Sequence, residues 1–217
     1  MMVLTSGLLS RFLPAFLSGM SVDFEMAGIA LVLGLVFGFL LALARFRGGV
    51  VGATASLVVG LMRAAPTFVV MFFLLNALPH GDLSGVMIVA VSLVPYAAAY
   101  VADSGVDALR QWHAGSHLAC LLILPNIARA FFVLVMSSSA GAAIGVPEGI
   151  AILLREAQKL PSIGDMLILF VIGIVCFSVP LQAGFAGVRL LQRYLGRVAL
   201  RNRPEPLPES SPVPARS

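Results

Sequence analysis

The sequence has 217 residues, of which 59% are hydrophobic and only 11% are charged. A soluble domain usually devotes about a quarter of its residues to charge, so lipid must cover much of this chain. The formal net charge is +4, but most basic residues lie at the ends of apolar segments. That distribution indicates membrane topology and argues against a nucleic-acid-binding face.

The first 20 residues predict a helix with one apolar side. Leu4, Leu8, Phe12 and Phe16 recur every four residues, and polar residues fall mostly between them. A helix of this kind suits the surface of a membrane. We therefore expect an interfacial amphipathic helix over residues 1–20, ahead of the membrane-spanning part.

Five apolar stretches follow, each long enough to cross about 30 Å of hydrocarbon as a helix. Within a membrane domain at residues 21–200, they predict transmembrane helices at about 24–45, 51–78, 84–102, 118–138 and 164–188. Each of the last four contains a proline, which kinks a membrane helix and frees a carbonyl group. The expected fold class is an all-α membrane protein, and the kinks favour a transporter core over a simple anchor.

Arginine is distributed unevenly between the two sides of the predicted spans. Arg45 and Arg47 follow the first span, Arg110 follows the third, and five arginines follow the fifth between residues 189 and 203. Because basic loops stay in the cytoplasm, the N-terminus should be periplasmic and the C-terminus cytoplasmic.

Two segments lie outside the predicted spans. Residues 201–217 are rich in Pro and Ser and cannot bury enough apolar surface to order themselves, which predicts a disordered cytoplasmic tail. Residues 140–163 predict a turn and then a short helix from about Glu148 to Leu160, on the outer side.

Four short motifs occur in order along the chain. They are LALAR at 41–45, RAAPT at 63–67, AYVAD at 99–103 and IGVPE at 144–148. In order and spacing they resemble the membrane subunits of ABC importers for polar amino acids, the histidine/glutamine/arginine/opine group. The resemblance covers about residues 18–195 and implies the type I ABC importer permease fold.

The resemblance implies an ATP-driven amino-acid importer in the bacterial inner (cytoplasmic) membrane, in which this chain forms half of the translocation pathway. The implied partners are an ABC ATPase subunit, a second permease subunit and a periplasmic substrate-binding protein. The sequence contains no GxxxxGK[ST] loop, and its single lysine, Lys159, lies in the unrelated context EAQKLP. ATP hydrolysis is therefore expected on a separate subunit, and no cofactor is expected here.

One departure from the family concerns the cytoplasmic loop that docks into the ATPase. The family reads Glu-Ala-Ala-x-x-x-Gly, whereas this chain has His113 for the glutamate, Gly115 for the second alanine and Ala119 for the glycine, in a shorter segment. The residues of this degenerate coupling loop are Gln111, Trp112, His113, Ala114, Gly115 and Ala119.

The degenerate loop has two interpretations. A heterodimer with a second permease carrying a complete loop would tolerate it, and we favour this over a homodimer. Alternatively, the chain is a non-transporting or regulatory membrane adaptor derived from such a permease. Trp112 can supply an aromatic anchor for docking in the first case.

Five residues are candidates for the translocation path: Arg63, Pro66, Arg129, Ser138 and Ser139. An arginine inside a membrane span is costly and usually faces a cavity or a partner, so Arg63 or Arg129 could meet a substrate carboxylate. The alternative is that each arginine satisfies groups near a neighbouring proline. The serines could bind substrate, but simple helix packing is favoured.

Other chemistry has weaker support in the sequence. Glu148 is a candidate contact for the binding protein, although capping of the following helix is favoured. His113 and His117 have a spacing used for metal but no acidic partner motif, so no metal site is predicted. A membrane hydrolase would need a nucleophile beside a base at membrane depth, which the sequence does not offer.

Overall fold

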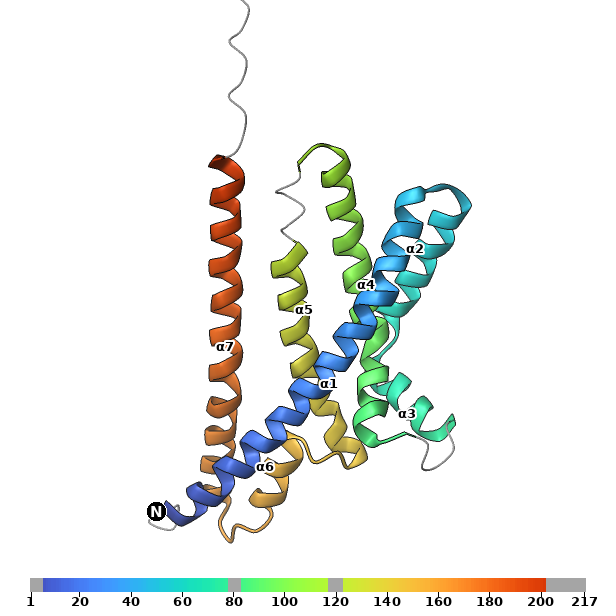
Figure 1. Cartoon of the computed structure of the whole chain (residues 1–217). Helices are drawn as coiled ribbons and strands as arrows, with labels where there is room; N and C mark the ends of the chain where they lie inside the picture. The colour runs from blue at the N-terminus through green and yellow to red at the C-terminus, as the bar shows by residue number, and fades with distance from the viewer. Residues whose placement is uncertain (1–5, 78–82, 117–122, 202–217) are drawn as a thin grey trace, which may run out of the picture.

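The computed structural model describes residues 6–77, 83–116 and 123–201, and all regular structure in these ranges is helical (Figure 1). The elements are α1 (Ser6–Arg47), α2 (Gly49–Ala64), α3 (Thr67–Ala77), α4 (Gly85–His113), α5 (Ile123–Ser138), the 3₁₀ helix η2 (Ser139–Ile144), α6 (Gly149–Ala157) and α7 (Ile163–Arg201). The expected all-α class is confirmed. The tail predicted at 201–217 lies outside the described residues, apart from Arg201.

Helix α1 crosses the bundle obliquely and packs along α4 (Figure 1). The contact depends on small residues at every fourth position of α1, namely Gly34, Gly38 and Ala42. A Cβ added at Gly38 would lie 2.6 Å from the carbonyl oxygen of Ala98. Without a side chain there, the two backbones approach closely, as is common between membrane helices.

The beginning of α1 differs from the separate interfacial helix expected over residues 1–20. One uninterrupted helix runs from Ser6 through that boundary, and Phe12 and Phe16 are buried in a cluster with Leu153 and Leu169. An apolar stripe fits a protein neighbour as well as a lipid surface, so its spacing alone could not distinguish the two.

The second apolar stretch, expected as one span at 51–78, is two helices bent by 91°. The break lies at Ala65, whose ψ of 116° is extended, and at Pro66. A proline disfavours the helical conformation of the residue before it. The pair α2 and α3 is therefore a broken span or a re-entrant segment.

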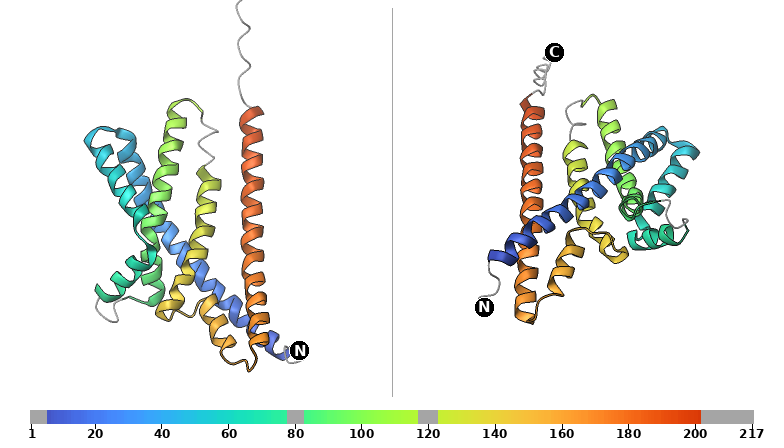
Figure 2. Two further views of the ribbon diagram at one scale, coloured as in Figure 1. Left: turned by 180° about the vertical axis from the view of Figure 1, so that it is seen from behind. Right: turned by 60° about the horizontal axis from the view of Figure 1, so that its bottom comes forward.

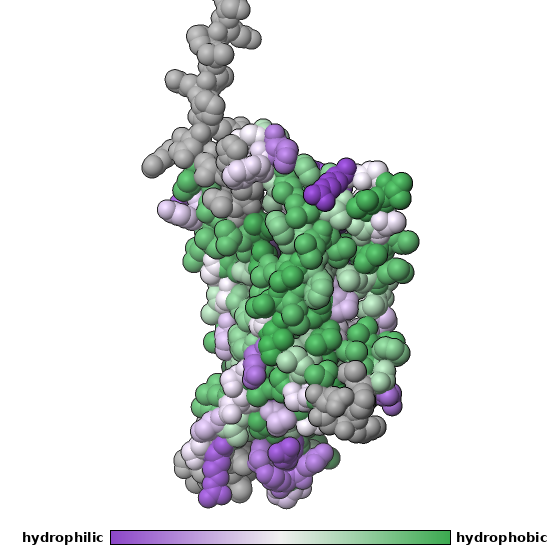
Figure 3. Space-filling model, turned by 45° about the vertical axis from the view of Figure 1, so that its right-hand side comes forward, coloured by the Kyte–Doolittle hydropathy of each residue, from purple (hydrophilic) through white to green (hydrophobic). Residues whose placement is uncertain are grey.

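Within the described residues, four helical units are long and apolar enough to cross a membrane, and the bent pair would be a fifth. The four are α1, α4, α5 continued by η2, and α7. Figure 3 shows apolar residues around the middle of one face, with hydrophilic residues gathered at its two ends. The chain is a multi-pass membrane protein.

Helices α4 and α7 continue well beyond the expected ends of their spans at 102 and 188. No glycine or proline stops α4 until Gly115, which has a φ of 79°. Among the described residues, helix α7 packs mainly along α5 and α6, and it stands at one edge of the bundle (Figure 2).

Candidate functional site

Asp103 of α4 joins three helices through two arginines. Its Oδ1 accepts a hydrogen bond of 2.6 Å from Nη1 of Arg45, in the last turn of α1. Its Oδ2 pairs with Nη2 of Arg63, in the last turn of α2. The side chain of Asp103 is 34% exposed and that of Arg63 is 61% exposed. A ligand beside this ion cluster could therefore contact both side chains.

A cavity of about 420 Å³ lies against this ion cluster. It is lined by Arg63, Tyr96, Ala99, Tyr100, Asp103, Ser104 and Asp107. Sites for small molecules commonly have volumes of about 300–1,000 Å³ and a few convergent polar groups. A guanidinium, two carboxylates and two phenols meet that description.

The charges divide this cavity into two parts. Arg45 and Arg63 share the single carboxylate of Asp103, which leaves an excess of one positive charge at that end. A guanidinium has five N–H donors, so Arg63 can hold Asp103 and still donate to an anion. Asp107 lies one helical turn away and is 70% exposed, with Arg110 at 3.9 Å as its ion-pair partner.

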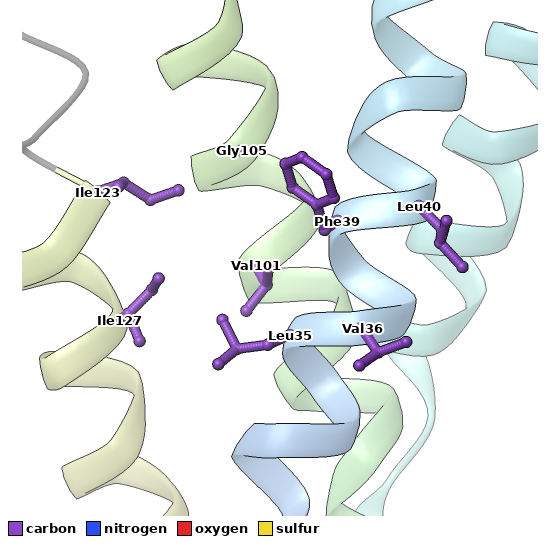
Figure 4. Close-up of a pocket in the computed structure, with 8 residues that line it drawn as sticks. All are labelled: Leu35, Val36, Phe39, Leu40, Val101, Gly105, Ile123 and Ile127. Atoms are coloured by element: carbon purple, nitrogen blue, oxygen red, sulfur yellow. The ribbon is translucent and has the colours of Figure 1, made fainter.

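A second cavity, of about 480 Å³, lies between α1, α4 and α5 (Figure 4). Leu35, Val101 and Ile127 point into it from the three helices, and its other lining residues are apolar or glycine. It has no side chain that could orient a polar solute. The arginine-lined cavity is therefore the better candidate site.

A different polar cluster ties together α1, α5 and α6. Asp23 is fully buried; its Oδ1 accepts from Ser138 Oγ at 2.7 Å and its Oδ2 from the Gly149 N–H at 3.2 Å. Glu148 is also fully buried and caps α6 by accepting from the N–H groups of Ile150 and Ala151, at 2.7 and 2.8 Å.

The two acids of this buried cluster have no ion pair with a cation among the described residues. Burial raises the pKa of Glu148 to about 7, and the nearby charge of Asp23 raises it as well, against the two N–H groups that lower it. The capping role favoured for Glu148 is what the geometry shows. With no exposed surface, its side chain cannot contact a binding protein without moving.

The five candidate path residues do not form one site. Arg63 lines the polar cavity, and Pro66 lies at the break between α2 and α3. Arg129 instead donates from Nη2 to Gln192 Oε1 of α7, at 3.3 Å. Ser138 belongs to the buried cluster, and Ser139 begins η2.

The expected coupling loop is partly a continuation of α4. Gln111, Trp112 and His113 form its last turn, Ala114 and Gly115 follow it, and Ala119 lies outside the described residues. The His113 ring packs on Phe46 of α1, with ring centroids 4.6 Å apart, whereas Trp112 is 53% exposed.

Sequence reasoning missed Asp103, Tyr96 and Asp107 as site residues. The sequence places Asp103 in the AYVAD motif and does not indicate that it lines a cavity. The sequence contains a usable signal, because Arg45 ends the first apolar stretch, Arg63 interrupts the second and Asp103 directly follows the third. Opposite charges near the ends of adjacent membrane helices tend to pair.

Two solved structures share this fold. One is a chain of an amino acid ABC transporter crystallised with histidines; it aligns over 86% of this chain and 96% of its own length, with 17% identity and a TM-score of 0.68. The other is a chain of the MetNI methionine ABC transporter in an inward-facing conformation, over 86% and 98%, with 18% identity and a TM-score of 0.60. No protein-family model and no curated protein sequence matches the chain. The fold is that of an ABC transporter permease.

Proposed function

We propose that the chain is a membrane-spanning permease subunit of an ATP-driven amino-acid importer and forms half of its translocation pathway. The observation that carries the proposal is the arginine-lined cavity within a permease fold. The fold is shared with a chain of an amino acid ABC transporter over nearly its whole length, and the cavity has the size and the charges for a small zwitterion.

In this proposal Arg63 binds the carboxylate of the substrate. Asp103 holds the guanidinium in place and leaves its remaining N–H donors for the ligand. Asp107, one turn of α4 from Asp103, accepts from the substrate ammonium group, and the hydroxyls of Tyr96 and Tyr100 complete the polar lining. The bend of 91° at Pro66 keeps Arg63 at a helix end.

The proposed assembly lies in the bacterial inner membrane, with the N-terminus periplasmic and the C-terminus cytoplasmic. An ABC ATPase subunit supplies the energy, a second permease completes the pathway, and a periplasmic binding protein delivers the substrate. Trp112 is exposed at the end of α4, and the arginine distribution favours a cytoplasmic position for that end. It is the proposed anchor for the ATPase.

One observation favours the second candidate function, a non-transporting or regulatory adaptor. The segment expected to couple to the ATPase continues α4 as far as His113, and His113 packs on Phe46. A permease with weak docking here needs a partner permease with a complete coupling loop, which is why we propose a heterodimer. An adaptor needs no such partner.

Purification of the chain from its own membranes tests the proposal. The importer predicts that an ATPase subunit and a second permease co-purify with it. Trp112→Ala should weaken the ATPase association by about 1–4 kcal/mol, as truncation of an aromatic anchor does, and His113→Glu should strengthen it. Leu154→Ala, an exposed leucine on α6, is the control. Recovery of the chain without any ATPase subunit would reject the importer.

A further inference from the structure

Three arginines gather where α5 meets the far end of α7. Arg129 of α5 donates to Gln192 of α7. Arg189 lies three residues before Gln192, so the two share one face of α7. Arg193 directly follows Gln192. All three arginine side chains are exposed.

The depth of these arginines follows from the length of α7. Residues 166–188, between Asp165 and Arg189, form a run of 23 without a charge. At about 1.5 Å per residue this run is about 34 Å long, slightly more than the hydrocarbon core of about 30 Å. Arg189 therefore lies at the edge of the hydrocarbon, and Arg193 lies one turn farther out, among the lipid headgroups.

Arg129 reaches the same depth from a different helix. The rings of Phe132 and Phe185 lie 5.2 Å apart and mark one level of the two helices. From that level, Arg129 is about 4.5 Å along α5 and Gln192 is about 10 Å along α7. The hydrogen bond to Gln192 shows that the Arg129 side chain extends outward, as a basic side chain does when it snorkels to the headgroup layer.

Within the described residues, no acidic side chain neutralises this charge. No Asp or Glu occurs in residues 166–204, and among the described residues none of the three arginines has an ion pair. A soluble partner could reach Arg193, but Arg189 lies at the edge of the hydrocarbon, against the headgroup layer. The chemistry available at that depth is the phosphodiester of a lipid, which arginine binds through paired N–H donors.

We propose that Arg129, Arg189 and Arg193 form a binding site for the headgroup of an anionic phospholipid between α5 and α7. The acyl chains lie along the exposed apolar side chains of α7 on the hydrocarbon side of Arg189, which include Val175 and Val179. The site is separate from the polar cavity at Asp103 and does not depend on which substrate, if any, the chain transports.

Lipid retention by the full-length chain in neutral detergent tests this site. Native mass spectrometry would compare phosphatidylglycerol with phosphatidylcholine, and wild type should retain phosphatidylglycerol at least tenfold better. The variant Arg129→Gln/Arg189→Gln/Arg193→Gln should lose that preference. Arg155→Gln/Lys159→Gln, which removes two exposed charges near the other end of α7, should keep it.

Two further measurements keep the result unambiguous. Arg193→Gln alone removes an exposed side chain and should lower phosphatidylglycerol retention severalfold even where the triple variant does not fold. Inorganic phosphate in large excess should leave lipid retention unchanged. An undiminished preference in the triple variant, or in Arg193→Gln when the triple variant does not fold, would overturn the proposal. Displacement of the lipid by phosphate would also overturn it, since that marks a small-anion site.

Discussion

The two polar clusters of this chain use acidic residues in opposite ways. In the cluster of Asp23 and Glu148 both side chains are fully buried and bonded to a hydroxyl and to backbone N–H groups. In the ion cluster, Asp103 is one-third exposed and is shared by two arginines.

The difference in exposure indicates a structural role for the cluster of Asp23 and Glu148, and it supports the proposed functional role of the ion cluster at Asp103. The buried cluster satisfies the N-terminus of α6 and joins it to α1 and α5, so its bonds are internal and no surface remains for a ligand. The ion cluster borders a cavity and leaves donors on Arg63. Substitutions in the first cluster should therefore change stability, and substitutions in the second should change transport.

The largest loss of stability is expected from Asp23→Ala. It removes the acceptor for the buried Gly149 N–H and one of the two acceptors of the Ser138 hydroxyl, and a buried unsatisfied polar group costs about 1–3 kcal/mol. The apparent midpoint of thermal unfolding in detergent should fall markedly, and Asp23→Asn, which keeps one acceptor, should lose less. An Asp23→Ala protein as stable as wild type would contradict the structural role assigned to Asp23.

A pH dependence is expected from Glu148. Its pKa rises from 4.5 to about 7 in the fold, so the folded state holds this proton more tightly than the unfolded state does. The resulting stabilisation is complete below pH 4.5 and is lost as the pH rises to about 7. The thermal midpoint of wild type should fall over that range.

Glu148→Gln provides the comparison for this titration. The amide keeps one oxygen to accept from the first turn of α6 and has no proton to lose. The decline in thermal midpoint between pH 4.5 and 7 should become shallower than in wild type. Identical profiles for the two proteins would contradict the assignment of the pH dependence to Glu148.

A smaller loss of stability is expected from Asp103→Asn. The exchange removes the carboxylate that pairs with Arg45 and Arg63. Because these side chains are partly exposed, each ion pair contributes about 1 kcal/mol or less to stability. The thermal midpoint should fall less than in Asp23→Ala. A loss equal to that of Asp23→Ala would show that both clusters are structural.

The smallest effect is expected from Arg110→Gln. Its pair with Asp107 is 3.9 Å long, and both side chains are about 70% exposed. The free energy of unfolding should stay within about 0.5 kcal/mol of wild type, as for most surface substitutions, so the thermal midpoint should hardly move. A larger change would mean that the end of α4 is packed in a way this pair does not reveal.

Much of the fold could be predicted from the sequence, because a segment that crosses a membrane must be apolar over the thickness of the hydrocarbon core. The spans of α4 and α7 begin within a residue or two of where the sequence suggests. The C-terminal ends of these helices were not predicted correctly. Helix α4, for example, continues through Asp107 and Arg110, and no helix-breaking residue occurs in that polar stretch before Gly115. Hydropathy marks where lipid ends and not where a helix ends.

The candidate site was less predictable because its residues come from three helices. The cost of burying a charge in a membrane makes Arg63 a candidate from the sequence. Its partner Asp103 can be identified only from the structure, in which α2 packs against α4. Arg129 has the same sequence signature as Arg63 and a different environment, beside Gln192. Side-chain direction at a given depth is set by helix rotation, which the apolar pattern does not fix.

ATP-dependent amino-acid uptake by the reconstituted complex tests the central claim most directly. Wild type would be compared with Arg63→Gln, and with Arg155→Gln on α6 as a control for loss of an exposed arginine. If the cavity beside Asp103 binds the substrate carboxylate, Arg63→Gln should lower uptake at least tenfold, mainly through substrate affinity, while Arg155→Gln transports normally. Uptake by Arg63→Gln at the wild-type rate and affinity would contradict the account.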